Sequence, residues 1–162
     1  LLTYKRALPM PPGAYLLGKT LMAMLAAAVV IVLLLIMSVT MAHVSLTVQQ
    51  AGKLLLSGVV GVLPFCALGM LVGTFIKGQG APGLLNLIYL PMSFLSGLWV
   101  PIQELPNALQ QIAPIWPSYH LHRVALAALD MQHGPITGDI AVLIGFSLVC
   151  FVIAARRLRR VG

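Results

Sequence analysis

Charged side chains are scarce in this chain, and acidic ones are almost absent. Only 8% of its 162 residues are Asp, Glu, Lys or Arg, and only three of these are acidic. Because a soluble domain carries about 25% charged residues, this chain has too few to cover a water-exposed globular surface. Its 60% hydrophobic content also excludes a disordered chain. The sequence therefore predicts an all-α integral membrane protein, whose net charge of +7 reflects basic residues at helix ends.

The sequence also lacks the residue sets of most enzymes and disulfide-bonded proteins. The two cysteines, Cys66 and Cys150, lie in apolar runs, which favours buried thiols over a disulfide. No nucleophile, base and orienting group occur together. No G-x-x-x-x-G-K-[ST] loop is present to bind the phosphates of ATP. We therefore expect no catalytic residues, no cofactor and no ATP hydrolysis by the chain itself.

Two motifs suggest chemistry that their context argues against. Gly78-Gln-Gly-Ala-Pro-Gly83 matches the dinucleotide-binding fingerprint, but it lies between two apolar runs rather than after a strand, so a tight turn is the better interpretation. His120, His122 and His133 share one segment, yet no cysteine joins them and nothing fixes a metal geometry. We expect no metal site.

Four apolar runs are long enough to cross a bilayer, which takes about 20 residues. They predict transmembrane helices at residues 20–42, 54–76, 81–100 and 136–155 of a single domain, 1–162. The remaining residues form a cytoplasmic lead-in, an outer segment between the third and fourth helices, and a cytoplasmic tail. These three parts are residues 1–19, 101–135 and 156–162.

The basic residues predict the orientation. With four spans, both ends lie on one side of the membrane. Placing them in the cytoplasm leaves only Lys53 and Arg123 of the ten lysines and arginines outside, in agreement with the positive-inside rule. The arginine-rich tail is expected to anchor the last helix and contact anionic lipid, with no nucleic-acid partner. The inside residues are Lys5, Arg6, Lys19, Lys77, Arg156, Arg157, Arg159 and Arg160.

Small and polar residues inside the spans are candidates for helix packing or a substrate path. Gly69 and Gly73 have the G-x-x-x-G spacing that lets two helices approach closely, either within the chain or at a dimer seam. Asn86 is polar at membrane depth, which suits a bond to a neighbouring helix or a place on a substrate path. Pro91 lies well inside the third run and should kink it.

The outer segment is expected to form a short re-entrant or amphipathic helical hairpin. A short helix is predicted between Pro106 and Pro114, with Pro106 at its first turn. Leu105, Leu109 and Ile112 recur there at i, i+4 and i+7, which is an amphipathic spacing. A second short helix is predicted from about residue 118 to about residue 129. Because irregular backbone at membrane depth must be covered by protein or water, this hairpin would pack in the mouth of an assembly. Its three apolar residues are the candidate outer gate.

Several stretches of the chain resemble a known family. The run from Gly83 to Ile102, G-L-L-N-L-I-Y-L-P-M-S-F-L-S-G-L-W-V-P-I, is followed by Leu105-Pro106, Ala113-Pro114 and Pro117-Ser-Tyr-His-Leu. Upstream lie Lys5-Arg-Ala-Leu-Pro-Met-Pro and Tyr15-Leu-Leu-Gly-Lys. Together these resemble the C-terminal half of an ABC-2 type transporter permease of the bacterial drug- and polysaccharide-export kind.

The resemblance implies a function and partners. Such a permease has six helices, so this chain, which starts without an initiator Met, is expected to hold the third to sixth. The family implies an exporter in the bacterial cell inner membrane, formed by two permease copies (a homodimer or a heterodimer) and ABC ATP-binding subunits that hydrolyse ATP. Lys5, Arg6 and Pro9 lie in the cytoplasmic stretch that would couple the chain to the ATPase.

Two other functions compete with this one. A secondary transporter half usually buries ionisable residues within its spans, whereas His43 and Asp139 lie only at the span edges. A non-transport four-helix membrane scaffold would not need a proline-broken outer segment. The transported substrate is not specified by any side chain.

Overall fold

The computed structural model describes residues 12–76, 80–132 and 134–161, and the described chain is helical with no strand. The long helices are α2, α3 and α7, and shorter helices connect α4 to α7. Their bounds are α2 (Pro12–Thr40), α3 (Val48–Phe75), α4 (Gly80–Phe94), η1 (Ile102–Glu104), α5 (Asn107–Ile112), η2 (Ala113–Ile115), α6 (Pro117–Ala128) and α7 (Thr137–Val161).

Three helices, not four, are long and apolar enough to cross a membrane in the described part of the chain. They are Gly13–Thr40, Val48–Phe75 and Thr137–Arg157. The third run, predicted as one helix over 81–100, is a helix of 15 residues, α4. At 1.5 Å per residue this helix is about 22 Å long, less than the ~30 Å hydrocarbon core. The apolar run continues past it, but the backbone turns, with Gly97 at a φ of 84°.

The first two long helices begin earlier than the apolar runs predict. α2 begins at Pro12, so part of the expected lead-in 1–19 is helical and Lys19 lies inside the helix. α3 begins at Val48 rather than at residue 54 because Thr47 and Gln50 form a capping box there. Both helices therefore carry a lysine within their span, which a long aliphatic side chain allows because its ammonium group can reach the interface.

α7 extends beyond the predicted end of the fourth span. Its backbone stays helical to Val161, so residues 156–161 of the expected tail 156–162 continue the helix rather than follow it. Arg157 fixes this end: its Nε donates to the carbonyl of Thr74 at 3.2 Å, and its guanidinium lies 3.6 Å from the centroid of the Phe75 ring. The arginine thereby satisfies a carbonyl in the last turn of α3 that has no partner within its helix.

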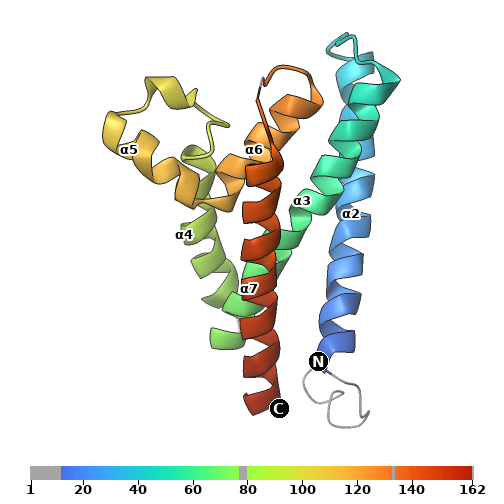
Figure 1. Ribbon diagram of the computed structural model, residues 1–162. Coiled ribbons are helices and arrows are strands. Elements are labelled where there is room, and N and C mark those ends of the chain that lie inside the picture. Colours follow the sequence, from blue (N-terminus) through green and yellow to red (C-terminus); the bar gives the residue numbers. More distant parts are fainter. Residues whose placement is uncertain (1–11, 77–79, 133, 162) are drawn as a thin grey trace.

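α3 is the centre of the packing (Figure 1). It runs obliquely between α2 and α7 and contacts α2, α6 and α7, whereas α4 contacts it at few points. The residues buried at this centre are small: Pro64, Ala67 and Val72 of α3, and Cys150 and Ala154 of α7. The start of α2 and the end of α7 lie at one end of the molecule, and the loop 41–47 and the segment before α7 lie at the other (Figure 1).

Candidate functional site

The segment between α4 and α7 folds into two arms. We call residues 101–132 the hairpin segment: η1, α5 and η2 form the first arm, and α6 forms the second (Figure 1). α5 and η2 lie between Pro106 and Trp116, and α6 runs from Pro117 to Ala128, in the regions where the sequence predicts two short helices. α6 packs against both α3 and α7, so the second arm connects the hairpin segment to the long helices.

A buried cluster joins α6 to α7. His120 lies on α6 and Asp139 in the first turn of α7, and their side chains meet with Nδ1 and Oδ1 2.7 Å apart. Arg123, one turn along α6, places Nη1 3.5 Å from the same oxygen. Only 4% of Asp139 is exposed. An acidic residue in the first turn of a helix also interacts favourably with the helix dipole.

His120 also closes the bend between the two arms. Its Nε2 lies 2.8 Å from the carbonyl oxygen of Pro114 in η2. Pro117, three residues after Pro114, has no N–H that could donate to this carbonyl in a backbone turn. The imidazole of His120 contacts the carbonyl oxygen instead. One buried side chain therefore contacts η2 and α7 from α6.

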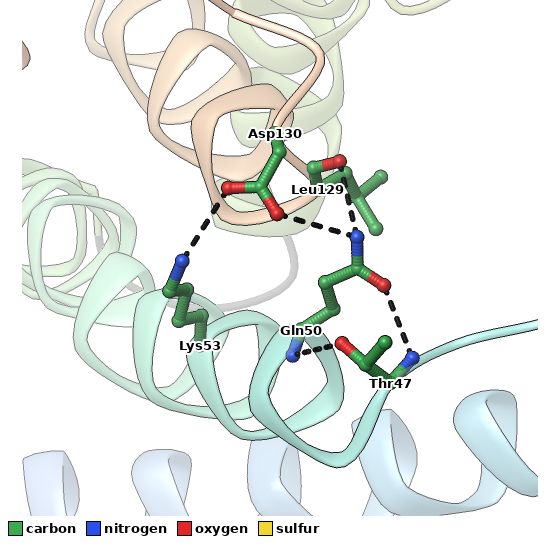
Figure 2. A network of polar contacts seen from close by, with 5 residues as sticks. All are labelled: Thr47, Gln50, Lys53, Leu129 and Asp130. Carbon is green, nitrogen blue, oxygen red and sulfur yellow. Dashed lines mark hydrogen bonds and ion pairs between the residues drawn. The ribbon is translucent and has the colours of Figure 1, made fainter.

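A second polar network holds the other end of α6 (Figure 2). Gln50 of α3 donates through Nε2 to the carbonyl of Leu129 at 3.4 Å and to Oδ2 of Asp130 at 3.3 Å. Lys53 lies 3.4 Å from Oδ1 of Asp130. The same Gln50 completes the cap with Thr47, so the start of α3 and the end of α6 share one network. Because both charged groups are largely exposed, this ion pair contributes little, about 0–1 kcal/mol.

α4 is attached to the same assembly by two side-chain hydrogen bonds. Ser118 of α6 donates to the carbonyl of Met92 at 2.7 Å, and Tyr89 donates to the carbonyl of Phe65 at 3.2 Å. A groove of 1010 Å³ runs between α2, α3, α4 and α6. The serine hydroxyls that line it, Ser38, Ser57, Ser93, Ser96 and Ser118, all donate to backbone carbonyls, so the groove offers an apolar surface.

The candidate gate residues are only partly brought together. Leu109 and Ile112 lie on α5, the short helix predicted between Pro106 and Pro114, but Leu105 is the C-cap of η1 and precedes α5, so the three do not lie on one helix. Pro106 is the N-cap residue of α5, so this helix begins only after Leu105. Leu109 is 37% exposed and Ile112 44% exposed. Their apolar face is thus open toward the surroundings of the chain.

Asn86 and Pro91 both lie on exposed parts of α4. No hydrogen bond connects the side chain of Asn86 to another described residue. Pro91 lies inside α4, three residues before its end at Phe94. Neither side chain is buried against α3. That both residues line a substrate path or contact another chain therefore stays a prediction.

Within the described chain, the glycines that let helices approach closely are not Gly69 and Gly73, for which a dimer seam stays a prediction. A methyl group at Gly73 would meet no atom within 4 Å, and one at Gly69 would meet only the Tyr89 hydroxyl at 3.8 Å. By contrast, a methyl group would overlap Ile31 of α2 at Gly58 and Leu121 of α6 at Gly61. These two glycines share a face of α3 at i and i+3, which is the signal in the sequence that marks this contact.

The described residues contain no group of three or more His, Cys, Asp or Glu placed to hold a metal ion. His122, which lies on α6 outside the three candidate spans, faces a second cavity beside Arg123 and Tyr119. Burial lowers the pKa of the His122 imidazole, which favours its neutral form. The predicted coupling residues, Lys5, Arg6 and Pro9, lie outside the described residues.

Comparison with known proteins identifies the family. A family model described as ABC-2 family transporter protein matches residues 5–156. The chain belongs to the ABC-2 transporter family. The resemblance seen in the sequence is therefore confirmed over nearly the whole chain.

A relative from Bacillus subtilis (strain 168), named "Putative transport permease YvfS", is 32% identical over 102 residues. The match covers 62% of this chain and 40% of the relative, so the chain spans less than half of the length of this relative. No solved structure matches the chain.

Proposed function

We propose that this chain is part of the membrane-spanning permease of an ATP-binding cassette exporter in the bacterial inner membrane. The observation that carries the proposal is the family match over residues 5–156, on a chain with three apolar helices and no phosphate-binding loop in its sequence. The energy would come from ATP hydrolysed by a partner subunit. Two permease copies, identical or different, would form the path.

The charge distribution supports a cytoplasmic location for both ends of the chain. Lys19, Arg156 and Arg157 lie toward the end of the molecule where α2 begins and α7 ends, whereas all three acidic residues lie toward the other end. This agrees with the positive-inside rule. The stretch that includes Lys5, Arg6 and Pro9 would then face the ATPase and receive its motion.

α4 and the hairpin segment complete the proposed membrane architecture. α4 would enter from the cytoplasmic end and stop short of the outer surface, where the hairpin segment covers its end through the Ser118–Met92 hydrogen bond. That arrangement would be a fourth crossing element with a re-entrant hairpin. Leu105, Leu109 and Ile112 would gate the exit, and Asn86, Pro91, Gly69 and Gly73 would face the path or the second permease.

Co-purification tests the proposal. The intact permease is expressed with the ATPase encoded by the neighbouring reading frame, purified and placed in liposomes. We expect a stable complex whose ATP hydrolysis changes when the permease is present and requires the Walker A lysine of the partner. A permease that purifies alone and moves solute along an ion gradient without ATP would instead support the secondary transporter, and one that does neither would support the scaffold.

A further inference from the structure

The buried His120 side chain has hydrogen-bond acceptors at both ring nitrogens. Nε2 faces the carbonyl oxygen of Pro114 at 2.8 Å, and Nδ1 faces Oδ1 of Asp139 at 2.7 Å. A carbonyl oxygen only accepts, so Nε2 must carry a hydrogen. An ionised carboxylate also only accepts, so the second bond requires one more hydrogen, on Nδ1 or on the carboxyl group.

Counting protons gives the states of the pair. An imidazolium with a carboxylate and a neutral imidazole with a carboxylic acid hold the same number of protons, and both make the two hydrogen bonds. When that shared proton leaves, the imidazole is neutral and has a single N–H, so it can donate to only one of its two acceptors. At the other ring nitrogen, a nitrogen lone pair then faces an oxygen lone pair. The geometry is therefore complete only in the protonated pair.

We infer that His120 and Asp139 form a proton-binding site that holds the hairpin segment against α7. Protonation joins α6 to both η2 and α7 through one side chain, and loss of the proton weakens one of the two connections. The hairpin segment would therefore loosen as the pH rises. This inference concerns the hairpin itself and does not depend on the proposed transport function.

The other groups around the pair do not replace its proton. Arg123 is 3.5 Å from Oδ1 of Asp139, but it can bond only to the carboxylate and cannot satisfy Nδ1. Tyr119 presents its ring edge-on to the imidazole at 5.3 Å. Lys53, the lysine of α3, pairs with Asp130 instead, and η2 and α5 contribute no titratable side chain. Oδ2 of Asp139 is buried and has no partner among the described residues.

His122 is a neighbouring titratable group with an effect of opposite sign. Burial lowers the pKa of His122, so the folded hairpin segment disfavours the protonated imidazole. Protonation of His122 would therefore loosen the hairpin segment as the pH falls. The His120–Asp139 pair loosens it as the pH rises. The direction of the response therefore separates the two histidines.

Hydrogen–deuterium exchange tests the site in the intact protein in liposomes. The readout is the protection factor of residues 113–124 between about pH 5 and about pH 9, which brackets the range where histidine changes charge, after division by the intrinsic exchange rate. We expect protection to fall about tenfold toward high pH, the factor that corresponds to one lost buried hydrogen bond. Protection of the α2 core should not follow this profile.

Asp139→Asn is the decisive variant. An asparagine amide can donate to Nδ1 of a neutral imidazole while Nε2–H still donates to Pro114, so both bonds persist without the extra proton. We expect Asp139→Asn to remove the pH response and to leave the hairpin segment protected at high pH. His120→Gln should also remove the response but leave the segment poorly protected throughout.

Two variants serve as controls. Arg123→Gln removes the neighbouring cation, and His122→Gln removes the neighbouring histidine; both should keep the fall in protection toward high pH. The inference is overturned if the wild-type hairpin shows no such fall, if Asp139→Asn retains it, or if His122→Gln abolishes it.

Discussion

Single glycines decide how closely the helices of this protein approach one another. Gly61 lies where α3 meets α6, with no room for a methyl group beside Leu121, whereas Gly73 has open space around it. Both lie in the same helix, α3, so they differ in surroundings rather than in helix propensity. They form a matched pair for measuring the packing.

Gly61→Ala should destabilise the protein, and Gly73→Ala should not. In an open helical site, alanine gains up to about 1 kcal/mol over glycine, but overpacking costs about 1–3 kcal/mol. We expect Gly61→Ala to unfold at a lower temperature than Gly73→Ala when the intact protein is heated in detergent. Equal unfolding temperatures would show that Leu121 moves away at no cost.

Leu109 on α5 carries the proposed gate. Leu109→Glu places a charge on the open apolar face, which costs about 2.5–3.5 kcal/mol at membrane depth on insertion scales. The intact protein should still insert, because the three long helices are untouched, but export should fall at least tenfold while the ATPase of the partner stays active. Export and ATP hydrolysis are compared at matched membrane levels.

The structure also selects the control for that variant. Gln110 donates through Nε2 to the carbonyl of Leu105 at 2.8 Å, so replacing it by Glu would break a contact. Gln111 is exposed and has no hydrogen bond to another described side chain, so Gln111→Glu adds the same charge beside it without that loss. Normal export by Leu109→Glu would show that α5 lies in water and does not gate.

At the scale of elements, caps and turns rather than apolar composition set the helix ends. Thr47 and Gln50 move the start of α3 to Val48, six residues before the predicted position. The backbone turns at Gly97, so the helix predicted over 81–100 ends early, at Phe94 of α4. A positive φ is strained for any residue with a Cβ, and a methyl group at Gly97 would also overlap Ile102.

Thr47→Ala should lower the stability of α3 by about 1 kcal/mol, within the range of about 0.5–2 kcal/mol for lost N-caps. Because Gln50 also holds Leu129 and Asp130, exchange should increase at the end of α6 as well as at the start of α3. Thr40→Ala is the control, since that hydroxyl only bonds back to Ile36 within α2. If the end of α6 is unaffected, the network of Figure 2 does not couple the two helices.

At the scale of the whole molecule, the start of α2 and the end of α7 lie together and the hairpin segment lies opposite (Figure 1). α2 is notable because none of its most apolar stretch is buried inside the chain. Such a surface needs lipid or another helix against it. The described chain is therefore a set of helices arranged for a membrane rather than around a large core of its own.

Cysteine labelling tests the orientation of this arrangement. In intact cells, Arg156→Cys should react only with membrane-permeant reagents, and Asn107→Cys should react with impermeant ones, because the two positions lie at opposite ends of the molecule and the basic end is expected inside. Cys66 and Cys150 are free, so labelling is compared with the parent protein. Labelling of position 156 from outside would reverse the proposed orientation.

The sequence by itself determined the membrane class, the existence of three of the four predicted long helices, and the family, because apolar runs and the segment around Pro91 and Pro101 are local properties of the sequence. The tertiary structure decided what lies together: Gly61 against Leu121, and His120 between Pro114 and Asp139. In the sequence, His120 is one of three histidines with no fixed metal geometry, and Asp139 lies at the edge of a span. They lie 19 positions apart in the sequence, and no short-range pattern records such a contact, because it forms only when α6 folds back onto α7.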